Sequence, residues 1–152
     1  MKIAVIGTGY VGLVTGVGFA ELGHEVTCVD VDAARIAALR RGEVPIFERG
    51  LPELLHRNAR AGRLAFSTST AEAVAGAKLA FIAVGTPSRP DGAADLRAVF
   101  DAAAEIGRAL DGFTVVVTKS TVPVGTTDRV RGVLAEVARH PFAVASNPEF
   151  LK

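Results

Sequence analysis

Short apolar runs alternate with longer amphipathic segments along the chain, and this pattern predicts that strands alternate with helices. Uninterrupted apolar or β-branched runs predict strands buried on both faces at residues 3–6, 25–29, 64–67, 79–84, 114–118 and 142–145. Apolar residues at helical spacing predict helices at residues 11–22, 33–41, 51–61, 70–75 and 95–110, and in a segment that Thr126 or Thr127 caps. Strands that alternate with helices predict one parallel sheet with helices on both faces.

Six strands are the number found in a complete dinucleotide-binding sheet. We therefore expect an α/β fold of the Rossmann type, a doubly wound six-stranded parallel sheet in three layers. At 152 residues, 49% of them hydrophobic and 22% charged, the chain is long and apolar enough to form one domain with a real core. Asp95 is the predicted N-cap of the helix that reaches Leu110.

The first predicted strand runs into glycines spaced Gly7-x-Gly9-x-x-Gly12, and an apolar segment of helical length follows. Glycines at this spacing permit a tight turn, close backbone approach to a pyrophosphate, and close packing of the helix on the strand. The free N–H groups at the helix start, where Tyr10 and Val11 lie, then face the phosphates. Glycines that serve only a tight turn are the plain alternative, but the strand–turn–helix–strand context favours a dinucleotide site.

Asp30 ends the second predicted strand and is the residue that selects among dinucleotides. A carboxylate there accepts hydrogen bonds from the ribose diol of an adenosine and repels a 2′-phosphate. The sequence therefore favours NAD over NADP as the cofactor. Arg35 is interpreted as lying along the same ribose or pyrophosphate edge. Its alternatives are to receive a 2′-phosphate or to be a solvated arginine on a helix surface.

The chemically distinctive residues of the chain follow predicted strands, in segments 7–12, 85–87, Ser120–Thr121 and 147–149. In an open parallel sheet, ligands bind in the crevice outside the carboxyl ends of the strands. These four segments are therefore predicted to meet around one ligand. Gly85 permits close backbone approach, and Pro87 stiffens the loop that holds Thr86.

Hydroxyl and carboxylate groups at these strand ends are candidates for catalysis. Thr121 offers a hydroxyl that can hold a water or a substrate oxygen. Asn147-Pro148 predicts a helix start whose N–H groups, at residues 150–151, would bind an anion or a carbonyl oxygen. Glu149 is then a candidate base or water activator, and Lys119 is predicted to be a surface residue at a strand end. The plain alternatives are that the threonines only end strands and that Glu149 complements a helix dipole.

Composition and charge argue against several other classes of function. The formal net charge of +1 gives no electrostatic support for binding nucleic acid or a membrane surface, and no apolar run approaches membrane-spanning length. The one cysteine, Cys28, lies inside a strand pattern and is predicted to be a small buried residue, in keeping with a cytoplasmic location. His24, His56 and His140 show no metal-ligand spacing, so no metal site is expected.

The chain carries five longer motifs, Gly7-Thr-Gly-Tyr-Val-Gly-Leu13, Val84-Gly-Thr-Pro87, Asp91-Gly-Ala-Ala-Asp95, Lys119-Ser-Thr-Val-Pro-Val-Gly-Thr126 and Asn147-Pro-Glu-Phe-Leu151. Together they resemble the N-terminal NAD-binding domain of the UDP-glucose 6-dehydrogenase family over essentially the whole chain. The Lys-Ser-Thr-Val-Pro-Val-Gly form is typical of the UDP-glucose branch, since the related GDP-mannose and UDP-N-acetylmannosamine dehydrogenases usually place the proline one position later. Arg49 departs from the family pattern, which usually has proline there.

The resemblance implies both a reaction and a cofactor site. Members of the family oxidise the C6 alcohol of UDP-glucose to a carboxylate through a cysteine-bound thioester, with two hydride transfers to two NAD molecules. By resemblance, Asp30 and Arg35 hold the adenosine ribose of NAD. Val11, Thr86 and Thr121 line the rest of the NAD site.

The resemblance also assigns the remaining chemistry. Thr121 and Glu149 position and activate water, and the backbone of Phe150 and Leu151 touches the substrate, UDP-glucose. The nucleophilic cysteine of the family and the central helix through which its members dimerise lie beyond residue 152. We therefore expect residues 1–152 to bind NAD but not to oxidise UDP-glucose alone. The alternatives are the cofactor domain of a GDP-mannose or UDP-N-acetylmannosamine dehydrogenase, or a stand-alone NAD-sensing module without chemistry.

Overall fold

The computed structural model describes residues 1–149, which contain one parallel sheet of six strands. The strands are β1 (Lys2–Ile6), β2 (Glu25–Val29), β3 (Leu64–Ser67), β4 (Leu79–Ile82), β5 (Thr114–Thr118) and β6 (Phe142–Ser146). Their order is β3-β2-β1-β4-β5-β6, and each neighbouring pair is parallel. The chain reverses its direction of progress between β1 and β4, so this is the Rossmann arrangement and the predicted fold class is confirmed.

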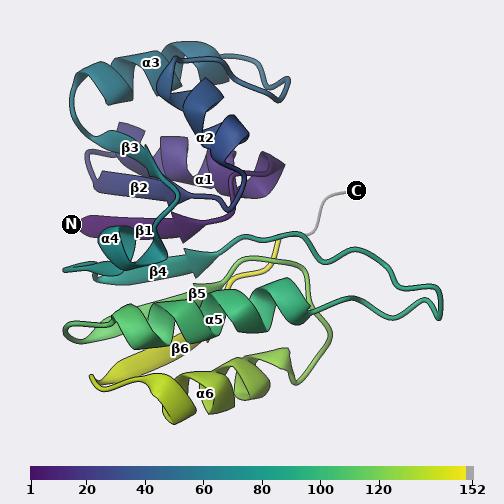
Figure 1. The fold of residues 1–152 in the computed structure, drawn as a ribbon. Coiled ribbons are helices and arrows are strands. Elements are labelled where there is room, and N and C mark those ends of the chain that lie inside the picture. Colours follow the sequence, from purple (N-terminus) through teal and green to yellow (C-terminus); the bar gives the residue numbers. More distant parts are fainter. Residues whose placement is uncertain (150–152) are drawn as a thin grey trace.

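Helices cover both faces of the sheet. They are α1 (Tyr10–Glu21), α2 (Ala33–Arg40), α3 (Leu51–Arg60), α4 (Thr70–Val74), α5 (Arg97–Ala109) and α6 (Thr126–Val137). Figure 1 shows α2 and α3 at the β3 end of the sheet, α6 at the β6 end, and a long loop projecting between β4 and α5. No helix in the described part of the chain is both long enough and apolar enough to cross a membrane.

The core consists of two clusters, one on each face, and β1 contributes to both. Ile3 and Val5 pack with buried residues of α1, α2 and α3, whereas Ala4 and Ile6 pack with those of α4, α5 and α6. Successive side chains of a strand point to opposite faces of the sheet. Because helices cover both faces, the buried residues of β1 are all apolar. The central strand is thereby fixed in register, which fixes where its glycine-rich continuation begins.

Cys28 lies in β2 and has no exposed surface. Burial raises the pKa of its thiol to about 12, so the prediction of a small buried residue is confirmed. A Cβ added to Gly16 of α1 would lie 2.3 Å from the Cys28 sulfur. Helix α1 therefore packs on the sheet more closely than any side chain at position 16 would allow.

Two local predictions were wrong, for the end of β4 and for the start of α5. Strand β4 ends at Ile82, and not at Val84, and the Ala83 carbonyl that follows lies against the glycine turn after β1. Helix α5 has Leu96 as its N-cap, and Asp95 instead accepts from the Arg97 backbone N–H at 3.0 Å, in a turn before the helix.

The caps of the last two predicted helices also differ. Gly125, at φ 86°, is the N-cap of α6, and the Thr126 hydroxyl donates to the Pro123 carbonyl instead of capping the helix. Asn147 and Pro148 are not helical in the described chain, and the Asn147 N–H donates to the Thr118 carbonyl at 2.9 Å. The predicted helix start at Asn147 is therefore absent from residues 147–149.

Candidate functional site

A turn of three glycines joins β1 to α1 and begins the candidate site. Gly7 has φ 104°, and a Cβ there would lie 2.4 Å from the Ala83 carbonyl oxygen. A Cβ on Gly12 would lie 2.0 Å from the Gly7 carbonyl oxygen. Both glycines are therefore required by the turn itself, because any side chain would collide with backbone.

Gly9 differs, because a Cβ at this position would meet nothing within 4 Å. Gly9 is the N-cap of α1 with ordinary extended backbone (φ −66°), and no side chain of the described residues caps the helix. The first N–H groups of α1, beginning at Tyr10, thus have no side-chain partner and face open space. A helix start of this kind suits a phosphate, because its N–H groups and its dipole both favour an anion.

The carboxylate of Asp30 lies just beyond β2 and is held in place by four hydrogen bonds. Its Oδ2 accepts from the Thr8 N–H at 2.9 Å, the Thr8 hydroxyl at 2.7 Å and Arg35 Nη1 at 3.2 Å. Among residues 1–149, its Oδ1 accepts only from the Asp32 N–H, at 3.1 Å. Since a carboxylate oxygen has two acceptor sites, Oδ1 keeps capacity for a ligand hydroxyl.

The environment of Asp30 favours the ionised form. Partial burial alone would raise the pKa of its carboxyl, but the hydrogen bonds from Thr8 and Asp32, with the charge of Arg35, lower the pKa below its ordinary value. Arg35 is committed to this ion pair, and its side chain is 40% exposed. It is therefore neither a purely solvated arginine nor an unpaired cation ready for a 2′-phosphate.

Two adjoining pockets run along the carboxyl edge of the sheet. The larger, of 620 Å³, is lined by Gly7, Gly9, Asp30 and Arg35 and by residues of α5. The smaller, of 250 Å³, is lined by Gly9, Tyr10, Val11, Gly85, Thr86, Lys119, Ser120 and Thr121. Gly9 and Gly85 line both pockets, so the two are continuous past the start of α1. Of the predicted cofactor residues, Gly12 and Pro87 line neither pocket.

Hydroxyl groups link the loops that follow β4, β5 and β6. Thr86 Oγ1 donates to the Thr121 carbonyl at 3.0 Å, and Thr121 Oγ1 donates to the Glu149 carbonyl at 2.9 Å. Ser120 is buried, and its hydroxyl donates to the Val84 carbonyl at 2.7 Å. The segments predicted to converge are thus brought together, although Ser120 lines the site with its hydroxyl already engaged.

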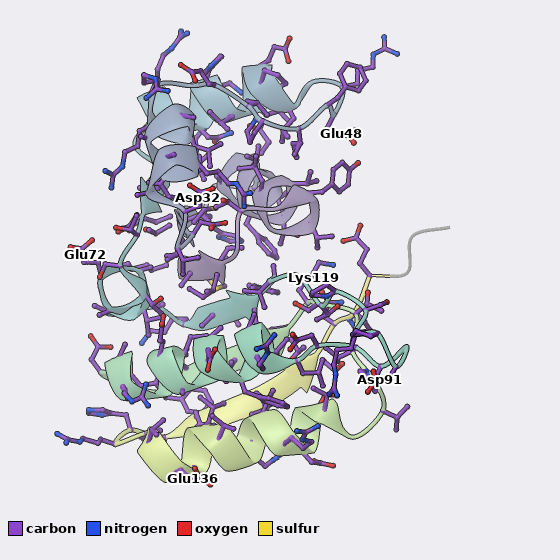
Figure 2. The ribbon with its side chains drawn as sticks, turned by 45° about the vertical axis from the view of Figure 1, so that its right-hand side comes forward. Asp32, Glu48, Glu72, Asp91, Lys119 and Glu136 are labelled. Atoms are coloured by element: carbon purple, nitrogen blue, oxygen red, sulfur yellow. The ribbon has the colours of Figure 1, made fainter. Side chains whose placement is uncertain are left out.

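Lys119, which lines the smaller pocket, forms an ion pair with Glu149. The Lys119 ammonium lies 3.4 Å from Glu149 Oε2, and the side chains are 15% and 32% exposed. The prediction that Lys119 is a surface residue was wrong, because Glu149 of the chain after β6 lies against it. Figure 2 shows Lys119 at the carboxyl end of β5. Phe150 and Leu151, the predicted substrate residues, lie outside the described residues.

Tyr10 connects the start of α1 to the loop between α2 and α3. Its hydroxyl donates to the carboxylate of Glu48, which Figure 2 shows on that loop. This hydrogen bond, then desolvation and the negative charges of Glu48 and Glu149, raise the pKa of the Tyr10 phenol. The ring is 42% exposed, so Tyr10 borders the smaller pocket without being enclosed by it.

A separate pocket of 530 Å³ lies beside α5 and α6 and shares no lining residue with the other two. Its arginines already have partners. Arg97 pairs with Asp95 at 2.5 Å, and Arg129 lies 4.4 Å from the centre of the Phe100 ring. The hydrogen bond from Arg97 lowers the pKa of Asp95 to about 2. Because it holds neither the glycine turn nor Asp30, this pocket is a weaker candidate than the edge with the glycine turn.

The sequence of residues 1–152 matches the UDP-glucose/GDP-mannose dehydrogenase family, NAD binding domain. The chain belongs to this family. The UDP-glucose 6-dehydrogenase YwqF of Bacillus subtilis is 54% identical over 154 residues, which cover 100% of this chain and 35% of YwqF. The UDP-glucose 6-dehydrogenase of Rhizobium meliloti is 56% identical over 156 residues, with the same coverage. The chain therefore spans about a third of the length of these curated relatives.

Solved structures of this dehydrogenase family share the fold. A UDP-glucose dehydrogenase from Pyrobaculum islandicum superposes with a TM-score of 0.94 at 51% identity, covering 99% of this chain and 36% of that structure. A GDP-mannose dehydrogenase from Pseudomonas aeruginosa superposes with a TM-score of 0.94 at 37% identity, covering 100% of this chain and 37% of the structure. Family membership confirms the predicted cofactor, NAD, since the matched part of the family is its NAD-binding domain.

Several residues of this NAD-binding domain were missed by reasoning from the sequence. Glu48, Thr70, Asp101 and Glu105 were not considered, and Lys119 was set aside. The helical spacing of Asp101 and Glu105 places them on one face of α5, which was the available signal. Nothing local to Glu48 indicates its partner, because Tyr10 lies far away in the chain.

Proposed function

We propose that residues 1–152 bind NAD along the carboxyl edge of the sheet, as the cofactor domain of a UDP-glucose 6-dehydrogenase. The observation that supports this most directly is that Asp30 and the glycine turn share one 620 Å³ pocket. UDP-glucose is favoured over GDP-mannose because the relatives at 54% and 56% identity are named for it, whereas the GDP-mannose dehydrogenase structure is 37% identical.

The residues present fit a dinucleotide. The open space at Gly9 leaves room for a pyrophosphate against the first N–H groups of α1. Asp30 Oδ1 then accepts from the adenosine ribose, and Arg35, paired with Asp30, stays beside it. Thr86 and Thr121 line the smaller pocket, where the other half of the dinucleotide would lie. When bound, NAD supplies the hydride acceptor of the reaction.

Thr121 and Glu149 are the proposed catalytic residues of the chain. The Thr121 hydroxyl donates to the Glu149 carbonyl and keeps its oxygen lone pairs, so it can hold a water beside the Glu149 carboxylate. Glu149 would accept a proton from that water, and Lys119 holds the carboxylate at the pocket. Phe150 and Leu151 are proposed, from the family resemblance alone, to bind the nucleotide sugar through their backbone.

The whole enzyme is proposed to oxidise UDP-glucose to UDP-glucuronate with two NAD and to act as a homodimer. Residues 1–152 alone are proposed to bind NAD without turnover. Their one cysteine, Cys28, has no exposed surface and a pKa raised to about 12, so it cannot serve as the nucleophile that the family uses. Formation of UDP-glucuronate by the purified chain would contradict this part of the proposal.

Calorimetric titration of the chain with NAD and with NADP tests the cofactor assignment. Wild type should bind NAD and bind NADP more weakly, because Asp30 repels the 2′-phosphate and Arg35 is already paired. Asp30→Ala should weaken the binding of NAD by about 10- to 150-fold, since a hydrogen bond to a charged group contributes about 1.5–3 kcal/mol.

Asp111→Ala is the matched control. The Asp111 carboxylate also accepts from a backbone N–H, that of Gly76 at 2.9 and 3.0 Å, and Asp111 lines neither pocket of the edge. Its loss should cost about 1 kcal/mol of stability while NAD affinity is retained. Equal binding of NAD and NADP, or equal loss in both variants, would contradict the role given to Asp30.

A further inference from the structure

The larger pocket extends beyond Asp30 onto one face of α5. Ala98, Asp101, Ala102 and Glu105 line it, at the spacing that places residues on one side of a helix. Thr70, the first residue of α4, lines it as well. This part of the pocket has no role in binding the pyrophosphate or the ribose, so it is available to the base.

Glu105 is held in place by Thr70. The Thr70 hydroxyl, on a residue only 9% exposed, donates to Glu105 Oε2 at 2.6 Å. Glu105 also lines an adjoining pocket of 350 Å³ together with Ser69 and Arg108, so it lies at the boundary between the two. Because one carboxylate oxygen is bound to Thr70, the other remains able to accept a hydrogen bond.

The charges of the larger pocket restrict what it can bind. Asp30, Asp101 and Glu105 contribute three carboxylates. Arg35, the one cation among the lining residues that the structure describes, is paired with Asp30 at 3.2 Å. The part of the ligand that lies against α5, beyond the pyrophosphate at the glycine turn, should therefore offer hydrogen-bond donors and no negative charge. An adenosine does so through its ribose diol and the exocyclic amine of adenine. The methyl groups of Ala98 and Ala102 suit the faces of a planar base.

We propose that Glu105 reads the base of the dinucleotide: its carboxylate, fixed by Thr70, accepts a hydrogen bond from the exocyclic amine of adenine. This role rests on the proposed NAD function. Hypoxanthine carries a carbonyl oxygen in place of that amine, so it brings an acceptor toward a carboxylate and forms no such bond. Glu105 is exposed at the edge of the pocket, so water can pair with its free oxygen, and the penalty for hypoxanthine is the loss of one hydrogen bond to a charged group.

The test compares NAD with nicotinamide hypoxanthine dinucleotide, in which a carbonyl oxygen replaces this amine and the neighbouring ring nitrogen carries a hydrogen. Calorimetric titration of wild type should give a dissociation constant about tenfold or more higher for the hypoxanthine compound. In Glu105→Gln, the amide oxygen can still accept from Thr70, while the amide nitrogen donates to the carbonyl oxygen of hypoxanthine. The preference for NAD should then disappear or reverse.

Glu72→Gln is the matched control. Glu72 also accepts a hydroxyl hydrogen bond beside α4, from Ser67 at 2.8 Å, but it lines neither pocket of the edge. Figure 2 shows Glu72 on α4, at the outer side of the molecule. Its substitution should leave the ratio of the two dissociation constants unchanged. Thr70→Val, which is isosteric and releases the Glu105 carboxylate, should lower the ratio part of the way.

The outcomes separate this role from the proposed function. Equal binding of the two dinucleotides by wild type, or an unchanged ratio in both Glu105→Gln and Thr70→Val, would overturn the base-reading role while NAD binding stands. Binding of neither dinucleotide would overturn the proposed function and this role together. Should Glu105→Gln fail to fold, Thr70→Val and the wild-type comparison still decide the matter.

Discussion

Replacing Gly9 by alanine should separate binding from stability. The backbone of Gly9 is ordinary for any residue, and a Cβ there would meet nothing within 4 Å. Two small terms then oppose each other in the folding free energy. Alanine stabilises by about 0.4–1 kcal/mol through the unfolded chain, and it is a poorer N-cap than glycine by a similar amount. The net change in stability should stay within about 1 kcal/mol.

The effect on NAD should be much larger. The added methyl occupies the space through which a pyrophosphate reaches the N–H groups at the start of α1. Loss of one hydrogen bond to a charged oxygen costs about 1.5–3 kcal/mol, which corresponds to about 10- to 150-fold in the dissociation constant. Gly9→Ala is therefore expected to fold normally and to bind NAD poorly.

Urea unfolding and calorimetric titration measure the two effects on the same samples. Gly18→Ala is the control within α1, because Gly18 is exposed, meets nothing within 4 Å and lines neither pocket of the edge. It should stabilise the chain by about 1 kcal/mol and leave NAD binding unchanged. An unchanged NAD dissociation constant in a folded Gly9→Ala chain would refute the placement of the pyrophosphate at this turn.

The other predictions concern the core and the charged groups. Gly16→Ala should destabilise by about 1–3 kcal/mol in urea unfolding, because its Cβ would lie 2.3 Å from the Cys28 sulfur; adding Cys28→Ala should relieve most of this, and additive losses would contradict the contact. The Cys28 thiol, buried with a pKa of about 12, should react with a thiol reagent only as fast as the chain unfolds, and rapid reaction in the folded state would contradict its burial. The lowered pKa of Asp30 stabilises the fold above its ordinary value of 3.8 and ceases to do so as the pH falls through the folded pKa. The difference in urea midpoint between wild type and Asp30→Asn should therefore shrink on acidification, and a constant difference would argue against this linkage.

The six-stranded parallel sheet could be predicted because strands that are buried on both faces appear in the sequence as uninterrupted apolar runs. The run from Leu79 to Val84 nevertheless overstates β4, which ends at Ile82. Just beyond this end the Ala83 N–H still donates to the Ile6 carbonyl at 2.8 Å, and the Ala83 carbonyl lies against Gly7, in a segment far apart in the chain. The apolar pattern indicates which residues are buried, but it does not indicate at which residue the strand ends.

The site could be predicted as a place but only partly as a set of contacts. The glycine turn and Asp30 follow from a local motif, so both were found. Lys119 was misjudged because its partner, Glu149, follows a different strand. Glu105 escaped notice because an amphipathic pattern identifies the buried face of α5 and not the groups at its margin. Residues that come into contact only through the tertiary fold show no characteristic spacing in the sequence, so their contacts could not be predicted.

The hydroxyl bonds that join Thr86, Thr121 and Glu149 bear on the entropy of binding. Each bond ties one strand-end loop to the backbone of the next, so the loops are ordered relative to one another in the described chain. Fixing a residue's backbone costs about 1–2 kcal/mol, and here that cost is incurred during folding instead of on ligand arrival. A ligand that binds to loops already ordered should associate without a conformational change. Its association rate should then depend on diffusional encounter and orientation.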